Sequence, residues 1–322
     1  MATLAPPSRA PGLVLSPDDD AALAARAVCR FHLRAFGRLE EAARAGDVEA
    51  VHQLRVTTRR LRATLRLFAP MLPRRFADGA DRELAWVAGT VGAVRDLDVL
   101  FEAIHARAVR LDPELRRALG PVGLAIHEQR EAALAALGEA IEGGRCRRLV
   151  HRLTMFADAP TAPRRTVRLG DAAPRLVEPL LRSVRRAARR LDGASPPADF
   201  HRLRVRVKRL RYGLETLRGL AGKPAARLLA RLEDAQDVLG ASQDAVTQID
   251  WLRTYAASGA DVGSLLPVGA LVQALARRGE KRRRKGLKVW RKIEAAKLLD
   301  DVADELATQA RERAPARERR RA

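Results

Sequence analysis

Histidine and basic residues recur with the same spacing in two segments of the chain, and this pattern indicates a site for a polyanion. Residues 51–62 read VHQLRVTTRRLR, and residues 200–211 read FHRLRVRVKRLR. The shared frame pairs two sets of residues at a separation of 149: His52, Arg55, Arg59, Arg60 and Arg62 with His201, Arg204, Lys208, Arg209 and Arg211. Arginine forks bind phosphate oxygens in pairs, lysine adds a point charge, and histidine donates when protonated.

Both segments have the spacing of helices in which a charged row borders a buried face. In the first helix, from Asp47 to before Pro70, the buried row is predicted to be Leu54, Thr58, Leu61, Leu65 and Phe68, and the neighbouring row is His52, Arg55, Arg59, Arg62 and Arg66. In the second helix, residues 198–220, the rows are Leu203, Val207, Leu210, Leu214 and Leu217 beside His201, Arg204, Lys208 and Arg211. No acidic residue occurs between Val51 and Pro73 or between Phe200 and Leu214. Solvated helix faces usually mix both signs, so these rows indicate an anionic ligand.

Composition restricts the fold and the partners. The 322 residues include 61 Lys and Arg against 39 Asp and Glu, a net charge of +22, which favours an anionic partner. Hydrophobic residues make up 47%, and Ala, Leu, Arg and Glu dominate, so we expect an all-α protein with a sizeable core. Cys29 and Cys146 show neither metal spacing nor a disulfide framework. We expect a cytoplasmic protein with no signal peptide, membrane span, metal or cofactor.

The order of predicted helices repeats, which indicates an internal duplication. We expect a disordered leader at 1–17, a first half at 18–156, a linker at 157–171, a second half at 172–308 and a disordered basic tail at 309–322. Predicted helices cover about 18–44, 47–69, 75–110, 113–140 and 145–156, then 172–191, 198–220, one that opens at Lys223-Pro224, and 265–308. Gly92 and Asp96 match Gly240 and Asp244 at a separation of 148.

These paired H-x-L-R-V-x-x-[RK]-R-L-R helices, the two Gly-to-Asp segments and the basic last helix resemble the CHAD domain family over residues 18–300. The resemblance implies two antiparallel four-helix bundles related by pseudo-twofold symmetry, with a basic central surface. It also implies binding of inorganic polyphosphate and association with polyphosphate granules, where granule proteins are possible partners. Some members carry a triphosphate-hydrolysing tunnel domain with an E-x-E-x-K motif, which this chain lacks, so we expect a stand-alone member.

Three further basic clusters are predicted to extend the site. They are Arg30 and Arg34 in the predicted helix at 18–44, Arg182 and Arg186 in the helix before the second motif, and Lys281, Arg284, Lys285 and Lys288 in the last helix. The alternative for each is an ordinary solvated surface. For His52 and His201, the alternative to a phosphate donor is a neutral histidine that joins two helices. We expect Asp96, Asp98 and Asp244 to order the motif helices by pairing with arginines rather than to bind a metal.

The expected function is therefore non-enzymatic binding of inorganic polyphosphate along a groove between the two halves. Nucleic acid is the main alternative, as a nonspecific competitor, but aromatic residues are only 4%, which leaves few platforms for stacking bases. No Walker A loop and no paired carboxylates occur in the basic rows, so nothing favours catalysis on phosphoanhydrides.

Overall fold

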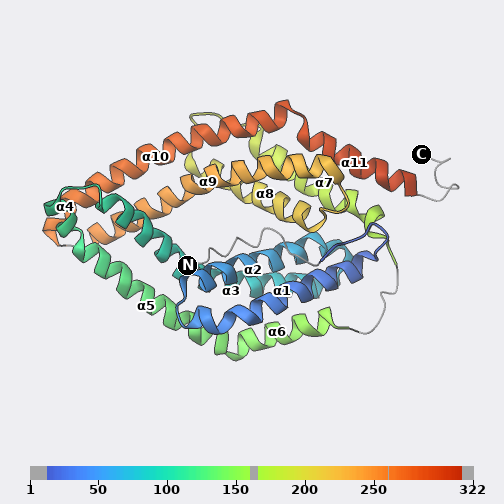
Figure 1. Ribbon diagram of the computed structural model, residues 1–322, viewed down its shortest axis with the longest axis horizontal. Coiled ribbons are helices and arrows are strands. Elements are labelled where there is room, and N and C mark those ends of the chain that lie inside the picture. Colours follow the sequence, from blue (N-terminus) through green and yellow to red (C-terminus); the bar gives the residue numbers. More distant parts are fainter. Residues whose placement is uncertain (1–12, 160–165, 260, 314–322) are drawn as a thin grey trace.

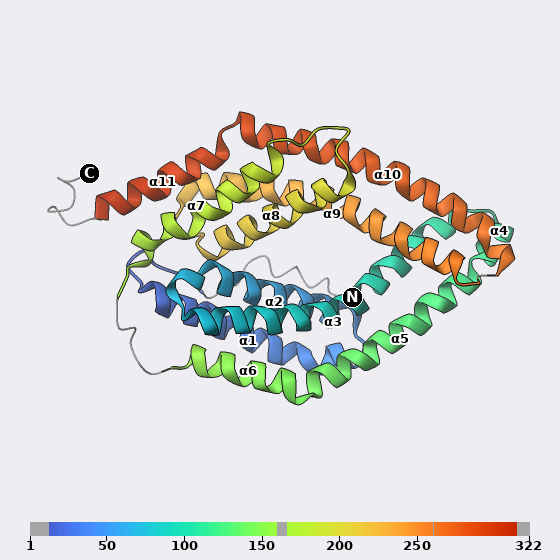
Figure 2. The same ribbon diagram turned by 180° about the vertical axis from the view of Figure 1, so that it is seen from behind.

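The computed structural model describes residues 13–159, 166–259 and 261–313, and the chain in these ranges is helical throughout its regular structure (Figure 1). Those ranges contain no β-strand, and one isolated bridge pairs Asp20 with Arg168. The expected all-α class is confirmed. The helices form two halves that lie one above the other, with α2 and α8 in the middle (Figures 1 and 2).

The first half consists of α1 (Ala21–Arg44), α2 (Val48–Leu67), α3 (Arg74–Ala108), α5 (Gly120–Glu142) and α6 (Gly144–Ala157). A short 3-10 turn (Ala69–Met71) follows α2, and the short α4 (Pro113–Ala118) precedes α5. Local signals explain the boundary between α1 and α2. Gly46 adopts a φ of +83°, a conformation that favours glycine, and the Asp47 carboxylate accepts a hydrogen bond from the Ala50 amide at 2.6 Å. The predicted boundary between a helix at 18–44 and one at 47–69 is confirmed.

The second half repeats this order with α7 (Leu169–Ala188), α8 (Pro197–Thr216), α9 (Gly222–Ala257), α10 (Val262–Ala295) and α11 (Leu298–Arg313). In each half two consecutive helices take the place of a fourth long helix: α5 and α6 in the first, α10 and α11 in the second. This arrangement is compatible with an internal duplication.

Two predicted helices are wrong in their continuity. The expected helix at 265–308 is interrupted at Lys297, which has a φ of +50°, and the expected helix at 113–140 consists of α4 and α5. The break at Lys297 turns α11 onto α7 and α9, where it buries Leu298, Val302 and Leu306. Burial of this apolar face stabilises the turn even though the local sequence favours a helix.

The two halves share their hydrophobic packing at both ends of the molecule. The larger core joins buried residues of α1, α2 and α3 to those of α7, α8 and α9, and a smaller core joins the ends of α3, α4 and α5 to the adjoining parts of α9 and α10. The predicted buried rows are confirmed, since Leu54, Leu61, Leu203 and Leu210 are all at most 1% exposed. The polar faces of α2 and α8 therefore lie between these two regions of apolar packing.

Parts of the predicted disordered leader, linker and disordered tail make regular contacts where the structure describes them. Residues 13–20 pack against the start of α7, where Leu15 is buried and the Gly170 amide donates to the Pro17 carbonyl at 2.8 Å. Residues 166–171 of the expected linker take part in the same contact, and residues 309–313 of the expected tail belong to α11. The rest of these expectations, at 1–12, 160–165 and 314–322, falls outside the described residues.

Candidate functional site: a cation cluster between α2 and α8

The two motif helices lie side by side and run in the same direction. Near one end of the pair, Arg55 of α2 lies close enough to Arg204 of α8 for its charge to lower the pKa of Arg204. Near the other end, Leu67 of α2 lies beside Gly213 of α8. Because each cationic row borders a buried row, burial of both apolar faces turns the two cationic rows toward a common space. Half-buried cations from both halves therefore gather there.

Four of these cations form what we call the cation cluster: Arg55 and Arg59 of α2, and Arg204 and Lys208 of α8. Burial, followed by the charges of Arg59, Arg204 and Arg55, lowers the pKa of Lys208 to about 6. Burial is also the main cause of the lowered pKa of Arg59 and of Arg204. Burial together with the neighbouring cations therefore disfavours the charged forms of these side chains in the free protein.

Few acceptors compensate the cluster. Arg55 pairs with Asp96 of α3 at 3.2 Å, whereas Arg59, Arg204 and Lys208 form no ion pair with any carboxylate in the described ranges. The Nε atoms of Arg59 and Arg204 are buried and have no hydrogen-bond partner among the described residues. Buried donors without partners are rare in folded proteins, and an anionic ligand would satisfy them.

Two cavities adjoin the cluster, and Arg55 and Arg59 line both. The first, of about 340 Å³, also contains His52, Arg95, Arg204 and part of α9 in its wall. The second, of about 410 Å³, is lined by Arg62, Arg66, Lys208, Arg209 and Tyr212 together with Ala85, Ala88 and Gly89 of α3. We call the two cavities together the central groove.

The small residues of α3 allow the arginines to reach this groove. A Cβ atom on Gly92 would lie 2.6 Å from the guanidinium of Arg55, so glycine is required for the present position of that side chain. The matched Gly240 lies close to Arg204 in the second half. The predicted pairing of the motif arginines with aspartates is confirmed for Asp96 with Arg55, while Asp98 pairs with Arg130 at 2.7 Å. No group of three or more potential metal ligands occurs within the described residues.

The two motif histidines differ in their surroundings. His52 is half-buried in the first cavity, where burial and the charges of Arg95, Arg59 and Arg55 lower its pKa, so the imidazole is neutral at pH 7. His201 is exposed, lies outside both cavities, and its Nδ1 forms a 2.6 Å hydrogen bond with Gln243 of α9. The contact of His201 matches the alternative in which a histidine joins two helices.

Arg62, Arg66 and Arg209 extend the groove. Arg62 and Arg66 both pair with Asp81 of α3, at 2.8 and 2.6 Å, which holds their side chains along the second cavity. Arg209 forms no ion pair in the described ranges, and burial together with the charges of Arg66 and Arg206 lowers its pKa. Arg209 is thus a further uncompensated cation at this end.

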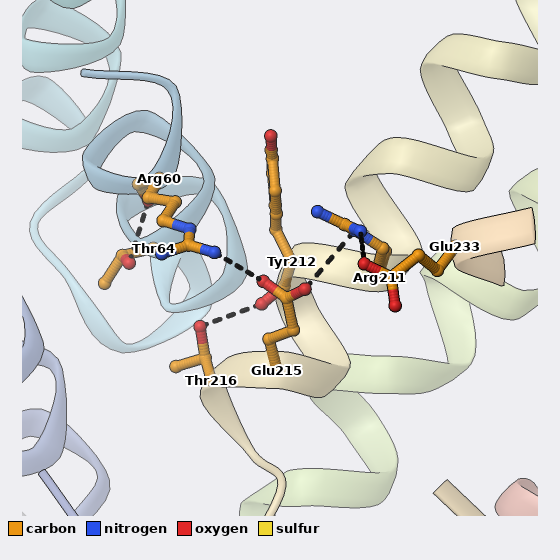
Figure 3. A network of polar contacts seen from close by, with 7 residues as sticks. All are labelled: Arg60, Thr64, Arg211, Tyr212, Glu215, Thr216 and Glu233. Carbon is orange, nitrogen blue, oxygen red and sulfur yellow. Dashed lines mark hydrogen bonds and ion pairs between the residues drawn. The ribbon is translucent and has the colours of Figure 1, made fainter. Parts of the chain in front are cut away.

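Two motif arginines, Arg60 and Arg211, lie outside the lining of the central groove and pair with carboxylates instead. The Glu215 carboxylate of α8 contacts Arg60 of α2 at 3.5 Å and Arg211 at 3.3 Å, and Arg211 also contacts Glu233 of α9 (Figure 3). Tyr212 lies between the cation cluster and these ion pairs. The guanidinium carbons of Arg59 and Arg211 are 5.8 and 5.6 Å from the centroid of its ring. Arg60 therefore connects the two halves through Glu215, whereas Arg211 joins α8 to α9 within the second half.

The outer basic residues do not reach the central groove. Arg30 pairs with Asp158 at 2.6 Å, and Arg34 is exposed on α1. Arg182 and Arg186 line a separate cavity of about 710 Å³ between α7 and the α10–α11 region. Lys281, Arg284, Lys285 and Lys288 are exposed on α10, where Arg284 pairs with Glu280 at 2.5 Å.

Sequence reasoning missed three residues that line the first cavity: Arg95, Gln248 and Trp251. Arg95 follows the Gly92 segment by three residues, so its helical spacing could have indicated it. Gln248 and Trp251 follow Asp244 by four and seven residues on α9, which places them on the same face of that helix. Their spacing from the matched aspartate was the available signal.

The fold and the site thus define an all-helical protein of two halves with an under-compensated cation cluster at their junction. A model of the CHAD domain matches residues 27–253, which is most of the chain. The chain therefore belongs to the CHAD domain family.

Two solved structures share this fold, and one of them is a CHAD domain. The crystal structure of the CHAD domain from the plant Ricinus communis has a TM-score of 0.69 and 26% identity, and the match covers 87% of this chain and 96% of that one. PptA from Streptomyces chartreusis has a TM-score of 0.68 at 21% identity, with 85% and 100% covered.

Two uncharacterized proteins from strains of Mycobacterium tuberculosis are 29% identical over 266 residues, or 80% of this chain. The chain spans about half the length of these curated relatives. None of the helices in the described ranges has both the length and the hydropathy that crossing a bilayer requires.

Proposed function

We propose that this chain binds inorganic polyphosphate in the central groove and catalyses no reaction on it. The observation that carries the proposal is the cation cluster, in which Lys208 has a pKa of about 6 while Arg59 and Arg204 have no carboxylate partner in the described ranges. A chain of phosphates would supply the missing negative charge and hydrogen-bond acceptors together.

The shape of the site supports a thin, flexible polyanion over a duplex. The uncompensated cations are half-buried in concave cavities rather than presented on a projecting helix. Duplex readers insert a helix or ribbon into a groove about 12 Å wide, whereas a duplex is too wide to enter cavities of this size and a single strand of phosphates is narrow enough. Nucleic acid is expected to bind the exposed basic surface as a nonspecific competitor.

A variant with four reversed charges tests the site. Changing Arg55, Arg59, Arg204 and Lys208 to Glu lowers the net charge from +22 to +14, because each reversal removes two charges. A matched control makes the same change at Arg38, Arg82, Arg116 and Arg253, which are exposed and lie outside the central groove. We expect the first variant to lose polyphosphate binding in a filter or calorimetric assay, while the control keeps most of it.

Folding is checked separately, because reversed charges in a half-buried place can unfold the chain. A milder pair, Arg59→Met and Lys208→Met, keeps the side-chain volume and removes two charges. If folded proteins with either set of changes bind long-chain polyphosphate as the control does, the site is elsewhere. Equal affinity of the wild type for polyphosphate and for DNA of equal charge, with equal salt dependence, would mean nonspecific binding and would refute the proposal.

We also propose that affinity for polyphosphate brings the protein to cytoplasmic polyphosphate granules. A fluorescent fusion of the wild type should colocalise with granules in polyphosphate-accumulating cells, and the fourfold Glu variant should not. If the control variant with matched net charge also fails to colocalise, bulk charge rather than the groove determines the localisation.

A further inference from the structure

The first cavity has an apolar wall that phosphate binding does not explain. The charged part of the lining consists of four arginines (Arg55, Arg59, Arg95 and Arg204) with Asp96 and Asp244, whereas Val56, Leu97, Leu100 and Trp251 form an apolar part. A bare polyphosphate chain has no apolar part, so contact with this wall would gain nothing. The composition of a few polar groups beside an apolar wall is typical of sites for small organic ligands.

One glutamine in this wall forms no hydrogen bond within the described residues. Gln248 of α9 is 7% exposed, lines the cavity, and forms no hydrogen bond in the described ranges. An amide that borders a cavity and has no protein partner offers a ligand both a donor and an acceptor. The edges of purine bases offer this pair, and glutamine amides bind adenine in this manner.

An aromatic ring stands one turn further along the same helix. Trp251 lines the cavity and stacks on Tyr255, with centroids 5.6 Å apart and an interplanar angle of 8°. Its indole N–H donates to the Gln129 side chain of α5 at 2.8 Å, which fixes the orientation of the ring. A fixed ring beside a cavity is a platform for stacking a base.

The separation of these groups fits a nucleotide. The cavity-lining residues of α9 run from Asp244, beside Arg204, to Trp251, and seven residues of helix rise about 10 Å. A base and the terminal phosphates of a nucleoside triphosphate are separated by about this length, and the cavity of about 340 Å³ lies in the range of small-ligand sites.

We propose that the first cavity binds a purine nucleoside polyphosphate, with the base between Trp251 and the Gln248 amide and the phosphates on Arg55, Arg59 and Arg204. This inference rests on the proposed function, because the same arginines bind the phosphates. It adds a discrete small-molecule ligand that competes with polyphosphate for the cluster.

The test compares ATP with inorganic tripolyphosphate by calorimetry at 150 mM salt and pH 7.5, with EDTA present. Tripolyphosphate has the same number of phosphates and a higher charge, so tighter binding of ATP cannot come from charge. We expect the wild type to bind ATP about tenfold more tightly, the effect of stacking one base. Gln248→Leu should remove part of this advantage, through the lost amide contact with the base, and leave the affinity for tripolyphosphate unchanged.

Gln236→Leu is the matched control, since Gln236 is another α9 glutamine with a buried, unpartnered Oε1 that lies outside the central groove. It should change neither affinity. Trp251→Leu, checked for folding by circular dichroism, should weaken ATP binding about tenfold and spare tripolyphosphate. Equal binding of both ligands by the wild type, or equal losses for both in Gln248→Leu, would overturn the inference.

The outcomes separate this inference from the proposed function. If long-chain polyphosphate and tripolyphosphate bind but ATP has no advantage, the nucleotide site is wrong and polyphosphate binding stands. If none of the three ligands binds, both fail together. Gln248→Leu should also leave the free protein at least as stable as the wild type, because it removes an unpartnered amide, whereas a packing role would make the variant less stable.

Discussion

Replacing Lys208 by Met should stabilise the free protein and weaken polyphosphate binding, a combination expected of a ligand-binding cation. The pKa of Lys208 falls from 10.5 to about 6, which corresponds to roughly 6 kcal/mol between the two protonation states. Because the side chain is half-buried and retains some solvent, we expect about 2–3 kcal/mol of this in solution. Methionine fills a similar volume without a charge.

The sign of the pH dependence follows from the lowered pKa. Between pH 6 and 10.5 the unfolded chain keeps the Lys208 proton and the folded chain loses it, so the free energy of unfolding rises with pH across this window. Lys208→Met removes this contribution. The gain in stability of the variant over the wild type should therefore be largest near pH 6 and should vanish toward pH 10.

Urea denaturation at pH 6.5 and pH 9.5 measures this difference. Arg206→Met is the control, because Arg206 is on the same helix and forms no part of the central groove's lining. Binding of polyphosphate at pH 7.5 should also protonate Lys208, so the wild type should take up about one proton more than the variant in calorimetry with buffers of different ionisation enthalpy. A destabilised variant, or equal proton uptake by both proteins, would refute the reasoning.

Three other predictions concern the neighbouring groups. The lowered pKa of His52 should rise when polyphosphate is added, because a bound anion offsets Arg95, Arg59 and Arg55; an unchanged NMR titration would place the anion elsewhere. Glu215→Gln should weaken polyphosphate binding, because Arg60 then no longer holds the halves against the repulsion within the cation cluster, whereas Glu233→Gln, at a more exposed carboxylate, should leave binding unchanged and lower the free energy of unfolding by less than about 1 kcal/mol. The logarithm of the affinity for polyphosphate should fall with the logarithm of salt concentration with a slope of about −3 to −5, the value for four to seven neutralised phosphates on a single strand; a slope near −1 would mean that the cluster does not bind the chain.

The core and the direction of the cationic rows could be predicted from the sequence because both depend on local periodicity. Leu54 and Leu203 recur at helical spacing, and the hydrophobic effect buries them whatever the partner helix is. The break at Lys297 could not be predicted in this way. Its flanking residues favour a helix, and only the packing of α11 on α7 and α9, between residues far apart in sequence, stabilises the turn.

The site was predictable in part for the same reason. The spacing indicated that Arg55 and Arg59 share a face, and the duplication indicated that Arg204 and Lys208 do too, but whether a cation stays uncompensated depends on carboxylates from other helices. Arg60 lies one residue from Arg59, yet Glu215 of the other half pairs with it. Sequence alone does not place such partners, and the roles of the outer clusters stay predictions.

The arrangement of the two halves explains why a basic row that destabilises the free protein is retained in both. One half alone would present Arg55 and Arg59 to water, where arginines are well hydrated and bind phosphate weakly. Juxtaposition of α2 and α8 instead buries part of each cation among like charges, as the lowered pKa of Lys208 shows. The cations have already lost much of their hydration when the ligand arrives, so each new contact with phosphate replaces less water and gains more. Packing at both ends of the molecule, together with the Arg60–Glu215 contact, holds the halves against this repulsion. Weakening that contact should therefore separate the cations and relax the pKa of Lys208 toward its ordinary value.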